Sequence, residues 1–256
     1  MNILITAGGT SEKIDDVRQI TNTATGRLGS LIADRFLESG KTSVTYLCSR
    51  NAALPARPHA RILRIGDVQS LQKAVENEMR RYPYDAVIHS MAVSDYRVKY
   101  SVPSEILAAR IAASVENKDF SGEDMTGTIH SALLSAGGGE RPGKISSDIE
   151  HLFLCLERTP KIIGLFKKLQ PKTVLVGFKL LSGAAEPRLL QAAENLMKQN
   201  GCDFVLANDQ KNIGETHHNA VLLGRDHSLL RLETREQIAL AIESRVAWKI
   251  KENRKA

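Results

Sequence analysis

The 256-residue chain is poor in cysteine and has no long apolar run. Its three cysteines, Cys48, Cys155 and Cys202, are scattered, and none forms a C-x-x-C pair or has a histidine at metal-ligand spacing. This pattern indicates neither a disulfide framework nor a zinc site, and it predicts buried thiols in a reducing cytoplasm. No apolar run approaches the roughly 20 residues that cross a bilayer. The opening segment Met1–Thr6 lacks the basic region and cleavage site of a signal peptide.

Aromatic residues are also scarce, at 5% of the chain, although the net charge is +6. Residues 241–256 hold five basic and two acidic residues and so supply +3 of this charge. We expect them to form a solvated helix end, where cations suit the helix dipole. The rest of the chain is only mildly basic and lacks the aromatic residues of a nucleic-acid platform. We therefore expect neither a nucleic-acid nor a membrane partner, whereas phosphorylated small molecules remain possible ligands.

Strand and helix patterns alternate along most of the chain. Apolar runs predict strands at Asn2–Thr6, Ser43–Cys48, Arg61–Ile65, Asp85–Met91, Leu152–Leu156, Thr173–Phe178 and Asp203–Ala207, and a hairpin through Ala220–Leu223 and Leu229–Leu232. Helices are predicted at Gly26–Ser39, after a cap at Asp67, from Thr159-Pro160, at Pro187–Asn200 before Gly201, and after the capping box Thr234-x-x-Gln237. The alternation predicts an α/β, Rossmann-like doubly wound fold with a mostly parallel sheet and helices on both faces.

Residues 100–143 interrupt this alternation. They contain an alanine-rich stretch, a polar segment and three consecutive glycines, Gly137–Gly139. Because α/β elements continue on either side, we interpret this stretch as an inserted loop or flap and not as a domain boundary. The prediction is one domain spanning residues 1–256, with an insertion at about 100–143.

A glycine-rich segment after the first expected strand is the strongest functional signal. Ile5–Thr10 contains Gly-Gly, and it is followed by Val17–Asn22, with an arginine and an asparagine, and by the Gly-containing Ala24–Gly29. Glycines after a strand let backbone N–H groups approach a phosphate, and glycines at a helix start add the positive end of its dipole. The dinucleotide fingerprint G-x-G-x-x-G is absent. One such glycine would indicate only a tight turn, but two clusters flanking Arg and Asn favour a phosphate site.

Four further segments follow at expected strand ends: Met91–Arg97, Lys144-Ile145, Val176–Leu180 and Leu206–Asp209. Together with the glycine-rich opening, and in this order, they resemble the phosphopantothenate–cysteine ligase family. The resemblance covers nearly the whole chain apart from residues 100–143. Ligands of open α/β sheets bind at the carboxyl ends of strands, which is where these segments are expected.

The resemblance implies a stand-alone ligase that joins 4′-phosphopantothenate to L-cysteine in coenzyme A biosynthesis. The carboxylate of the acid would displace pyrophosphate from a nucleoside triphosphate, and the cysteine amine would then attack the acyl-nucleotidylate. Charge that gathers on the α-phosphate needs fixed donors and a cation. CTP is the favoured nucleotide, but Lys179-Leu180 is more similar to the eukaryotic-type branch, so ATP stays open. Mg²⁺ and a cytoplasmic homodimer with a shared site are also implied.

The resemblance also assigns roles to individual residues. Lys144 would stabilise the phosphate charge, Asn22 would hold the acyl-nucleotidylate, and Arg18 would reach phosphopantothenate bound mainly by the neighbouring subunit. Ala92 and Asp95 would line the junction of substrate and nucleotide. Asp95 and Lys144 would also contact the nucleotide, in a pocket formed by Gly8, Gly9, Ala24, Gly26, Gly29, Phe178 and Asn208. No side chain is expected to bind a metal ion directly.

Three other functions are weighed. A non-catalytic nucleotide sensor would bind without turnover. An NAD(P)-dependent short-chain oxidoreductase would share the fold, but its glycine turn is absent and Tyr96 is followed by Lys99 at the wrong spacing. A P-loop NTPase would use residues 138–144, which have G-x-x-x-x-G-K spacing, but Ile145 stands where a magnesium-binding hydroxyl is required.

The remaining polar residues near these motifs receive structural interpretations. His89 is expected to be a core or supporting histidine. His217-His218 is expected to lie in a polar loop, because no carboxylate cluster or third ligand accompanies it. Asp15 and Asp16 are assigned to a solvated turn.

Overall fold

The computed structural model describes residues 1–116, 122–137 and 143–255, and the chain divides into two compact units. The first, here called the sheet unit, comprises Met1–Thr10, Asn22–Val93 and Lys161–Ala256. The second, here called the ribbon unit, comprises Ser11–Thr21 and Ser94–Pro160. The ribbon unit is therefore wider than the insertion expected at about 100–143. That the two units act as a single ligase domain stays a prediction.

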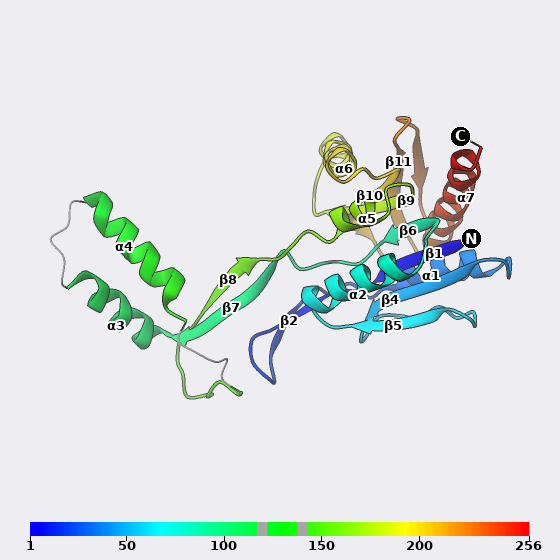
Figure 1. The fold of residues 1–256 in the computed structure, drawn as a ribbon. Coiled ribbons are helices and arrows are strands. Elements are labelled where there is room, and N and C mark those ends of the chain that lie inside the picture. The colour runs from blue at the N-terminus through cyan, green and yellow to red at the C-terminus, as the bar shows by residue number, and fades with distance from the viewer. Residues whose placement is uncertain (117–121, 138–142, 256) are drawn as a thin grey trace. The chain divides into compact units, whose positions relative to one another are not determined.

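The sheet unit is built on an eight-stranded sheet (Figure 1) in the order β12-β11-β10-β9-β6-β1-β4-β5. Its strands are β1 (Asn2–Ala7), β4 (Ser43–Ser49), β5 (Arg61–Ile65), β6 (Ala86–His89), β9 (Val174–Leu181), β10 (Phe204–Ile213), β11 (His218–Gly224) and β12 (Leu229–Leu232). The run from β5 to β10 is parallel, and β11 and β12 add an antiparallel edge. Strand order reverses between β1 and β6, and such a switch point is where doubly wound sheets bind ligands.

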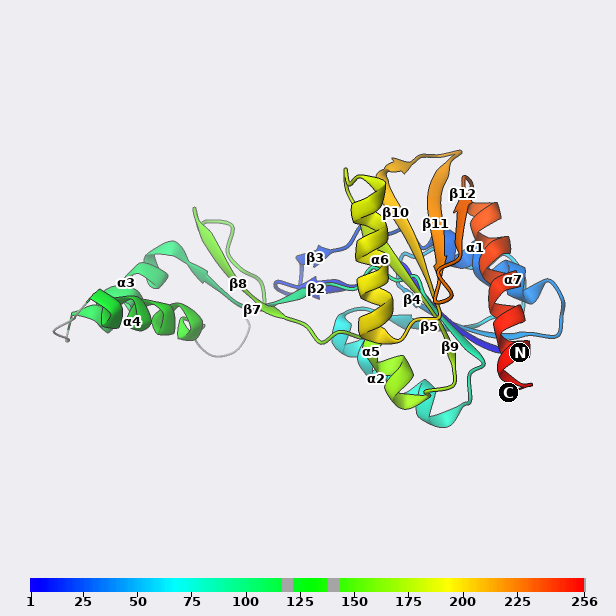
Figure 2. The ribbon, with the colours of Figure 1, turned by 90° about the horizontal axis from the view of Figure 1, so that it is seen from above.

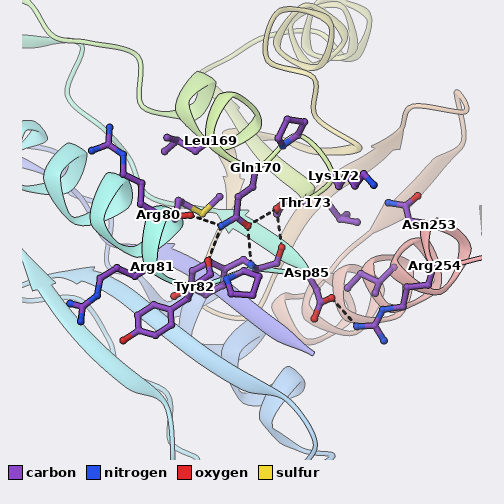
Figure 3. A pocket seen from close by; sticks show the side chains of 16 residues that line it. Arg80, Arg81, Tyr82, Asp85, Leu169, Gln170, Lys172, Thr173, Asn253 and Arg254 are labelled. Carbon is purple, nitrogen blue, oxygen red and sulfur yellow. Dashed lines mark hydrogen bonds and ion pairs between the residues drawn. The ribbon is translucent and has the colours of Figure 1, made fainter.

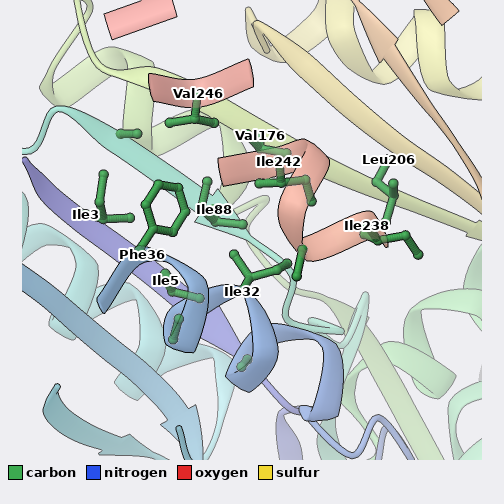
Figure 4. Packing of buried hydrophobic residues seen from close by; sticks show 14 of the residues in the cluster. Ile3, Ile5, Ile32, Phe36, Ile88, Val176, Leu206, Ile238, Ile242 and Val246 are labelled. Atoms are coloured by element: carbon green, nitrogen blue, oxygen red, sulfur yellow. The ribbon is translucent and has the colours of Figure 1, made fainter. Parts of the chain in front are cut away.

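Helices cover both faces of this sheet, as predicted. Figure 2 shows α1 (Arg27–Leu37) and α7 (Arg235–Asn253) on one face, and α2 (Val68–Arg81), α5 (Ile163–Leu169) and α6 (Glu186–Asn200) on the other. The alternation of side chains along β1 produces this division, because Ile3 and Ile5 face one core and Leu4 faces the other. In the first core, Ile3 and Ile5 pack with Ile32 and Phe36 (Figure 4).

Most predicted helix ends are confirmed. Asp67 accepts a hydrogen bond from the Ser70 backbone N–H at 2.7 Å and caps α2. Gly201 ends α6 in the left-handed conformation. Thr234 caps α7 by accepting from the Gln237 N–H at 3.2 Å. The start predicted at Thr159-Pro160 is wrong, since α5 begins at Ile163 and the Thr159 hydroxyl donates to the carbonyl of Ser94.

The ribbon unit contains β2 (Ser11–Lys13) paired with β3 (Gln19–Thr21), the long antiparallel ribbon of β7 (Tyr96–Pro103) and β8 (Leu152–Arg158), and the helices α3 (Ser104–Val115) and α4 (Gly122–Ser135). The loop expected at 100–143 is therefore corrected, because the described part of this stretch is mainly helical. That the stretch acts as a flap stays a prediction. The strand expected at Leu152–Leu156 exists, but it pairs with β7 and not with the large sheet.

Two sequence interpretations concern residues in or next to the ribbon unit. Residues 138–142 of the P-loop-like segment lie outside the described residues. Lys144 leads into a turn and then β8, not into the helix that a P-loop requires. The prediction of buried thiols is confirmed for Cys48 and Cys202 but is wrong for Cys155, which is half-buried on β8. In the ranges 1–116, 122–137 and 143–255, no helix is long and apolar enough to cross a membrane.

Candidate functional site

Two glycines shape the connection between the end of β1 and the start of α1. Gly8 and Gly26 have φ of 84° and 75°, a conformation that glycine adopts without strain. A Cβ atom on Gly26 would lie 2.9 Å from the Ala52 Cβ and 3.2 Å from the Gly8 backbone nitrogen. Gly26 also begins α1 without a side-chain cap, so the helix start suits an anion that accepts from its N–H groups.

Two other predicted residues flank this connection. Ala24 is exposed in the segment that leads to α1. Gly29 is buried where α1 crosses the strand ends, since an added Cβ would lie 2.6 Å from the Ala7 Cβ and 2.8 Å from the Ser90 Oγ. The structure thus gives Gly29 a packing role, and a role in nucleotide binding stays a prediction.

Asn22 is fixed at the switch point between β1 and β6. Gly9 and Ala92 form a parallel bridge that extends the pairing of these strands, and the Ala92 N–H donates to the Gly8 carbonyl at 2.9 Å. The Ala92 carbonyl accepts from the Thr10 N–H and from Asn22 Nδ2, both at 3.1 Å. The Asn22 N–H donates to the Thr10 carbonyl at 3.2 Å. Four of the predicted residues, Gly8, Gly9, Asn22 and Ala92, are thereby brought together.

Phe178 and Asn208 lie toward the carboxyl ends of β9 and β10. Phe178 is half-buried and packs against the core below α1 and α7. Asn208 is buried, and its Nδ2 lies 2.9 Å from Nε2 of His218. The polar loop expected for His218 is wrong, because the residue is 5% exposed and begins β11. Burial is the main cause that lowers the pKa of His218 to about 4.

Arg18 and the segment around Lys144 meet within the ribbon unit. Arg18 Nη2 donates to the Ile145 carbonyl at 2.7 Å, and its Nε and Nη2 lie 3.0 and 2.8 Å from Asp15 Oδ2. Lys144 is exposed. Asp95 is also exposed, and its backbone carbonyl accepts from the Thr159 N–H at 3.0 Å.

The prediction that Asp15 lies in a solvated turn is wrong, because its side chain is fully buried. Burial raises the pKa of the Asp15 carboxyl, but hydrogen bonds from the backbone N–H groups of Val17, Arg18 and Ile145 and from the Arg18 guanidinium outweigh it. The pKa is held well below its usual range. Asp16 is exposed, as expected. The spacing of Asp15 and Arg18 was a visible signal for this ion pair, but the contact with Ile145 had no local signal.

The predicted site residues are thus divided between the two units. The sheet unit holds Gly8, Gly9, Asn22, Ala24, Gly26, Gly29, Ala92, Phe178 and Asn208. The ribbon unit holds Arg18, Asp95 and Lys144.

Asp209 is a supporting residue that the sequence interpretation quoted within a motif without a role. It is buried, and its carboxylate accepts from the N–H groups of Gly183, Ala184 and Lys211 at 3.1, 2.6 and 2.8 Å. These backbone hydrogen bonds lower the pKa of Asp209. The loop between β9 and α6 is fixed in this way to β10.

His89 is a core histidine, as predicted. Its Nδ1 lies 2.8 Å from the Thr6 hydroxyl, and its ring packs edge-on against Phe166 at 5.1 Å. Burial lowers its pKa to about 4, so the ring is neutral at pH 7.

A pocket of about 740 Å³ lies at the amino ends of β6 and β9, at the opposite strand ends from the switch point (Figure 3). Gln170 organises it, donating from Nε2 to the carbonyls of Met79 and Tyr82 at 2.6 and 2.7 Å and accepting from the Tyr84 N–H at 2.9 Å. The carboxyl ends of α2, α5 and α7 line this pocket together with the basic residues Arg80, Arg81, Lys172 and Arg254. Cations there complement the helix dipoles, so a structural role explains them. None of the predicted site residues lines this pocket.

Comparison with known proteins gives one family. Residues 1–115 and 139–250 match the family described as "DNA/pantothenate metabolism flavoprotein C-terminal domain". The coenzyme A biosynthesis bifunctional protein CoaBC of Thermococcus kodakarensis is 32% identical over 236 residues, which is 91% of this chain and 48% of that protein. The chain therefore spans about half the length of this curated relative.

Solved structures agree with this match. The crystal structure of the DNA/pantothenate metabolism flavoprotein from Streptococcus pneumoniae is 34% identical, with a TM-score of 0.77 and coverage of 97% of this chain and 99% of that one. The C-terminal domain of a coenzyme A biosynthesis bifunctional protein CoaBC is 22% identical, with a TM-score of 0.67 and coverage of 98% and 96%. The second likeness bears on the fold alone, and both agree with the doubly wound α/β architecture.

Proposed function

Since this chain belongs to the DNA/pantothenate metabolism flavoprotein C-terminal domain family, we propose that it ligates 4′-phosphopantothenate to L-cysteine in coenzyme A biosynthesis. The observation that carries the proposal is the fixed position of Asn22 against Ala92 at the switch point between β1 and β6. The glycine connection of Gly8 and Gly26 adjoins it. A polar side chain beside a glycine-lined strand end is what a phosphorylated substrate needs.

The proposed reaction begins with activation of a carboxylate. An oxygen of the acid attacks the α-phosphate of a nucleoside triphosphate, pyrophosphate leaves, and an acyl-nucleotidylate forms. The amine of cysteine then attacks the acyl carbon and releases the nucleoside monophosphate. In this scheme Asn22 holds the acyl-nucleotidylate, and backbone N–H groups near Gly8 and Gly26 donate hydrogen bonds to the phosphate oxygens and stabilise their charge.

Two cationic side chains serve the proposed chemistry. Lys144 neutralises charge that develops on the α-phosphate, and its exposed side chain has the freedom to reach a ligand. The guanidinium of Arg18 is engaged by Asp15 and Ile145, which orients it. Arg18 would contact phosphopantothenate bound by a neighbouring subunit, while Ala92 and Asp95 line the junction of the two substrates.

The nucleotide is proposed to be CTP, with ATP as the alternative. Phe178 would form an apolar wall near the base, and the amide of Asn208 would contact the nucleotide. Mg²⁺ would be held through oxygens of the triphosphate, as is usual for an ion that retains several waters. The proposed setting is the cytoplasm, which suits three cysteines that are all free thiols.

We also propose a homodimer, supported by the apolar surface of the ribbon unit. The side chains of Tyr96, Phe153 and Leu156 on β7 and β8 are 50%, 52% and 44% exposed. A two-stranded ribbon is at best marginally stable by itself in water, so a second copy of the ribbon is a fitting cover for these side chains.

The proposal is tested by pyrophosphate release from purified protein with phosphopantothenate, cysteine and Mg²⁺, using CTP and ATP in separate reactions. We expect release that depends on both the acid and the triphosphate, and a peptide-type product that also requires cysteine. The same release is measured for Asn22→Ala, which we expect to be much slower. Asn77→Ala, at an exposed position of α2, is its control. Nucleotide binding without any pyrophosphate release, from folded protein, would contradict the ligase and favour a nucleotide sensor.

A further inference from the structure

The carboxylate of Asp15 is the centre of a buried hydrogen-bond network in the ribbon unit. Its Oδ1 accepts from the N–H groups of Val17 and Arg18 at 2.8 and 2.6 Å. Its Oδ2 accepts from Arg18 Nε and Nη2 at 3.0 and 2.8 Å, and from the Ile145 N–H at 3.2 Å. The last bond joins residues 130 positions apart in the sequence. A charged group with this many donors is stable when buried and costly to disturb.

This network holds Ile145 through both its backbone N–H and its backbone carbonyl. The Ile145 N–H donates to Asp15, while the Ile145 carbonyl accepts from Arg18 Nη2 at 2.7 Å. Next to these bonds, the N–H of Asp16, one residue after Asp15, donates to the carbonyl of Gly143, two residues before Ile145, at 2.9 Å. The backbone on either side of Lys144 is therefore attached to the turn that carries Asp15.

Within the described part of the chain, the side chain of Lys144 is not held by hydrogen bonds, although the backbone on either side of it is. Ile145 is buried, whereas Lys144 is exposed and forms no hydrogen bond or ion pair with another described residue. A fixed backbone with an uncommitted ammonium group is the arrangement expected of a residue that meets a ligand. Fixing the backbone lowers the entropy lost when the amine engages a phosphate.

We propose that Asp15 is a positioning residue, which holds Lys144 for the triphosphate by fixing Ile145 directly and through Arg18. Asp15 itself touches no substrate. The inference rests on the proposed function, because it gives Lys144 the role of binding phosphate. A carboxylate that only stabilised the turn would make the same local bonds, so the test must connect Asp15 to Lys144.

The first measurement does not depend on activity. Asp15→Asn keeps the size of the side chain and removes its charge and one acceptor oxygen, and Asp16→Asn is the matched control at the exposed neighbour. Trypsin cleavage after Lys144 is followed in the full chain by mass spectrometry. We expect cleavage to be about tenfold faster in Asp15→Asn, as for the loss of one or two charged hydrogen bonds, and unchanged in Asp16→Asn.

The second measurement is single-turnover pyrophosphate release. We expect the rate of Asp15→Asn to fall about a hundredfold, as for a misplaced catalytic group. The KM for cysteine, measured separately from steady-state product formation, should be unchanged. The rate of pyrophosphate release by Lys144→Ala should fall by at least the same factor. At saturating phosphopantothenate, where a weaker contact through Arg18 no longer limits the rate, the double variant should be no slower than Lys144→Ala, because Asp15 has no further role once the amine is absent.

Independent losses that multiply in the double variant would overturn the proposal, as would unchanged cleavage after Lys144 in Asp15→Asn. If Asp15→Asn does not fold, Asp15→Glu keeps the charge with a different reach and is subjected to both measurements. Wild-type protein that releases no pyrophosphate would remove the proposed function and with it the positioning role. The trypsin result would then still report whether Asp15 fixes the backbone at Ile145.

Discussion

Asn208 and His218 form a buried polar pair between neighbouring strands, with Nδ2 of the amide 2.9 Å from Nε2 of the ring. Donation by the amide requires Nε2 to be an acceptor, so the proton of the neutral ring lies on Nδ1. That Nδ1 is buried and has no hydrogen-bond partner among the described residues. Burial, and to a lesser degree the nearby side chains of Arg235 and His217, lowers the pKa of His218 to about 4.

We expect the free energy of unfolding to fall on acidification from pH 6.5 to 4. His89 and His218 have pKa values of about 4 in the folded protein, below the ordinary histidine value of 6.5. Between these values the unfolded chain binds more protons, so stability is present above pH 6.5 and is lost as the pH falls through this window. Each histidine contributes up to about 3 kcal/mol to this change. Urea unfolding at several pH values in this range measures it.

The double variant His89→Gln, His218→Gln provides the control for this pH dependence. Its stability should be lower at pH 7 and should change less between pH 6.5 and 4. The depressed carboxyl pKa values of Asp15 and Asp209 affect stability only at lower pH, as those groups become protonated. An unchanged slope in the double variant would contradict the assignment to these two histidines.

The sheet could be predicted because its signals are local. Asn2–Ala7 and Val174–Leu181 are short apolar runs, and caps such as Asp67 and Gly201 act within a few residues. The segment of α3 is rich in alanine and has only a weakly apolar face, so its sequence resembles a loop insertion as much as a helix. Leu152–Arg158 has the composition of a sheet strand, and nothing in its sequence specifies β7 as its partner.

The candidate site could be predicted in part for the same reason. The connection at Gly8 and Gly26 is recognisable because backbone positions with positive φ favour glycine, and glycine is visible in the sequence. Asp15 could not be recognised as buried, since Ile145 supplies one of its donors from a distant part of the chain. His218 was misassigned because two adjacent histidines suggest a polar loop, whereas the strand that buries one of them is defined by pairing with β10.

Gly26→Ala is expected to destabilise the protein and to weaken nucleotide binding. The new Cβ would be strained by a φ of 75° and would press on Ala52 and on the Gly8 backbone. Gly40→Ala is a matched control, because Gly40 has a φ of 66° and open space around the Cβ position. We expect Gly40→Ala to cost about 1 kcal/mol from the left-handed conformation alone. Gly26→Ala should cost about 1–3 kcal/mol more, from overpacking.

Urea unfolding and isothermal titration with CTP and ATP separate these effects. Gly40→Ala should bind nucleotide as the wild type does. If both variants lose the same stability, the space around Gly26 accommodates the added Cβ atom without overpacking.

Asn22→Ala is expected to lower pyrophosphate release by about 10²–10³-fold, as for removal of one preorganised donor. Stability should fall by only about 1 kcal/mol, the net worth of the hydrogen bond from Asn22 Nδ2 to the Ala92 carbonyl. Quenched-flow measurement of the first turnover, with thermal unfolding in parallel, checks both values. If the rate falls by no more than the fraction of folded protein does, Asn22 has no direct role in the reaction.

The proposed homodimer predicts that charge on the ribbon will separate the subunits. Phe153→Lys with Leu156→Lys places two ammonium groups on side-chain positions that are 52% and 44% exposed. We expect the mass by light scattering to fall from two chains to one, because an interface does not tolerate unpaired charges. Asn77→Lys adds the same residue at an exposed position of α2 and should leave the mass unchanged.

A shared site makes a stronger prediction than association alone. If Arg18 acts on substrate bound by the other subunit, then inactive Asn22→Ala and inactive Arg18→Gln should complement each other when mixed and re-equilibrated. Random assortment gives one heterodimer for every two dimers, and each heterodimer has one site with both residues intact, so activity should return to about a quarter of wild type. The ribbon variant of Phe153 and Leu156 cannot exchange partners and should abolish this recovery when it is introduced into both chains. Mixtures that stay inactive, from proteins that do form dimers, would show that Arg18 and Asn22 serve the same subunit's site.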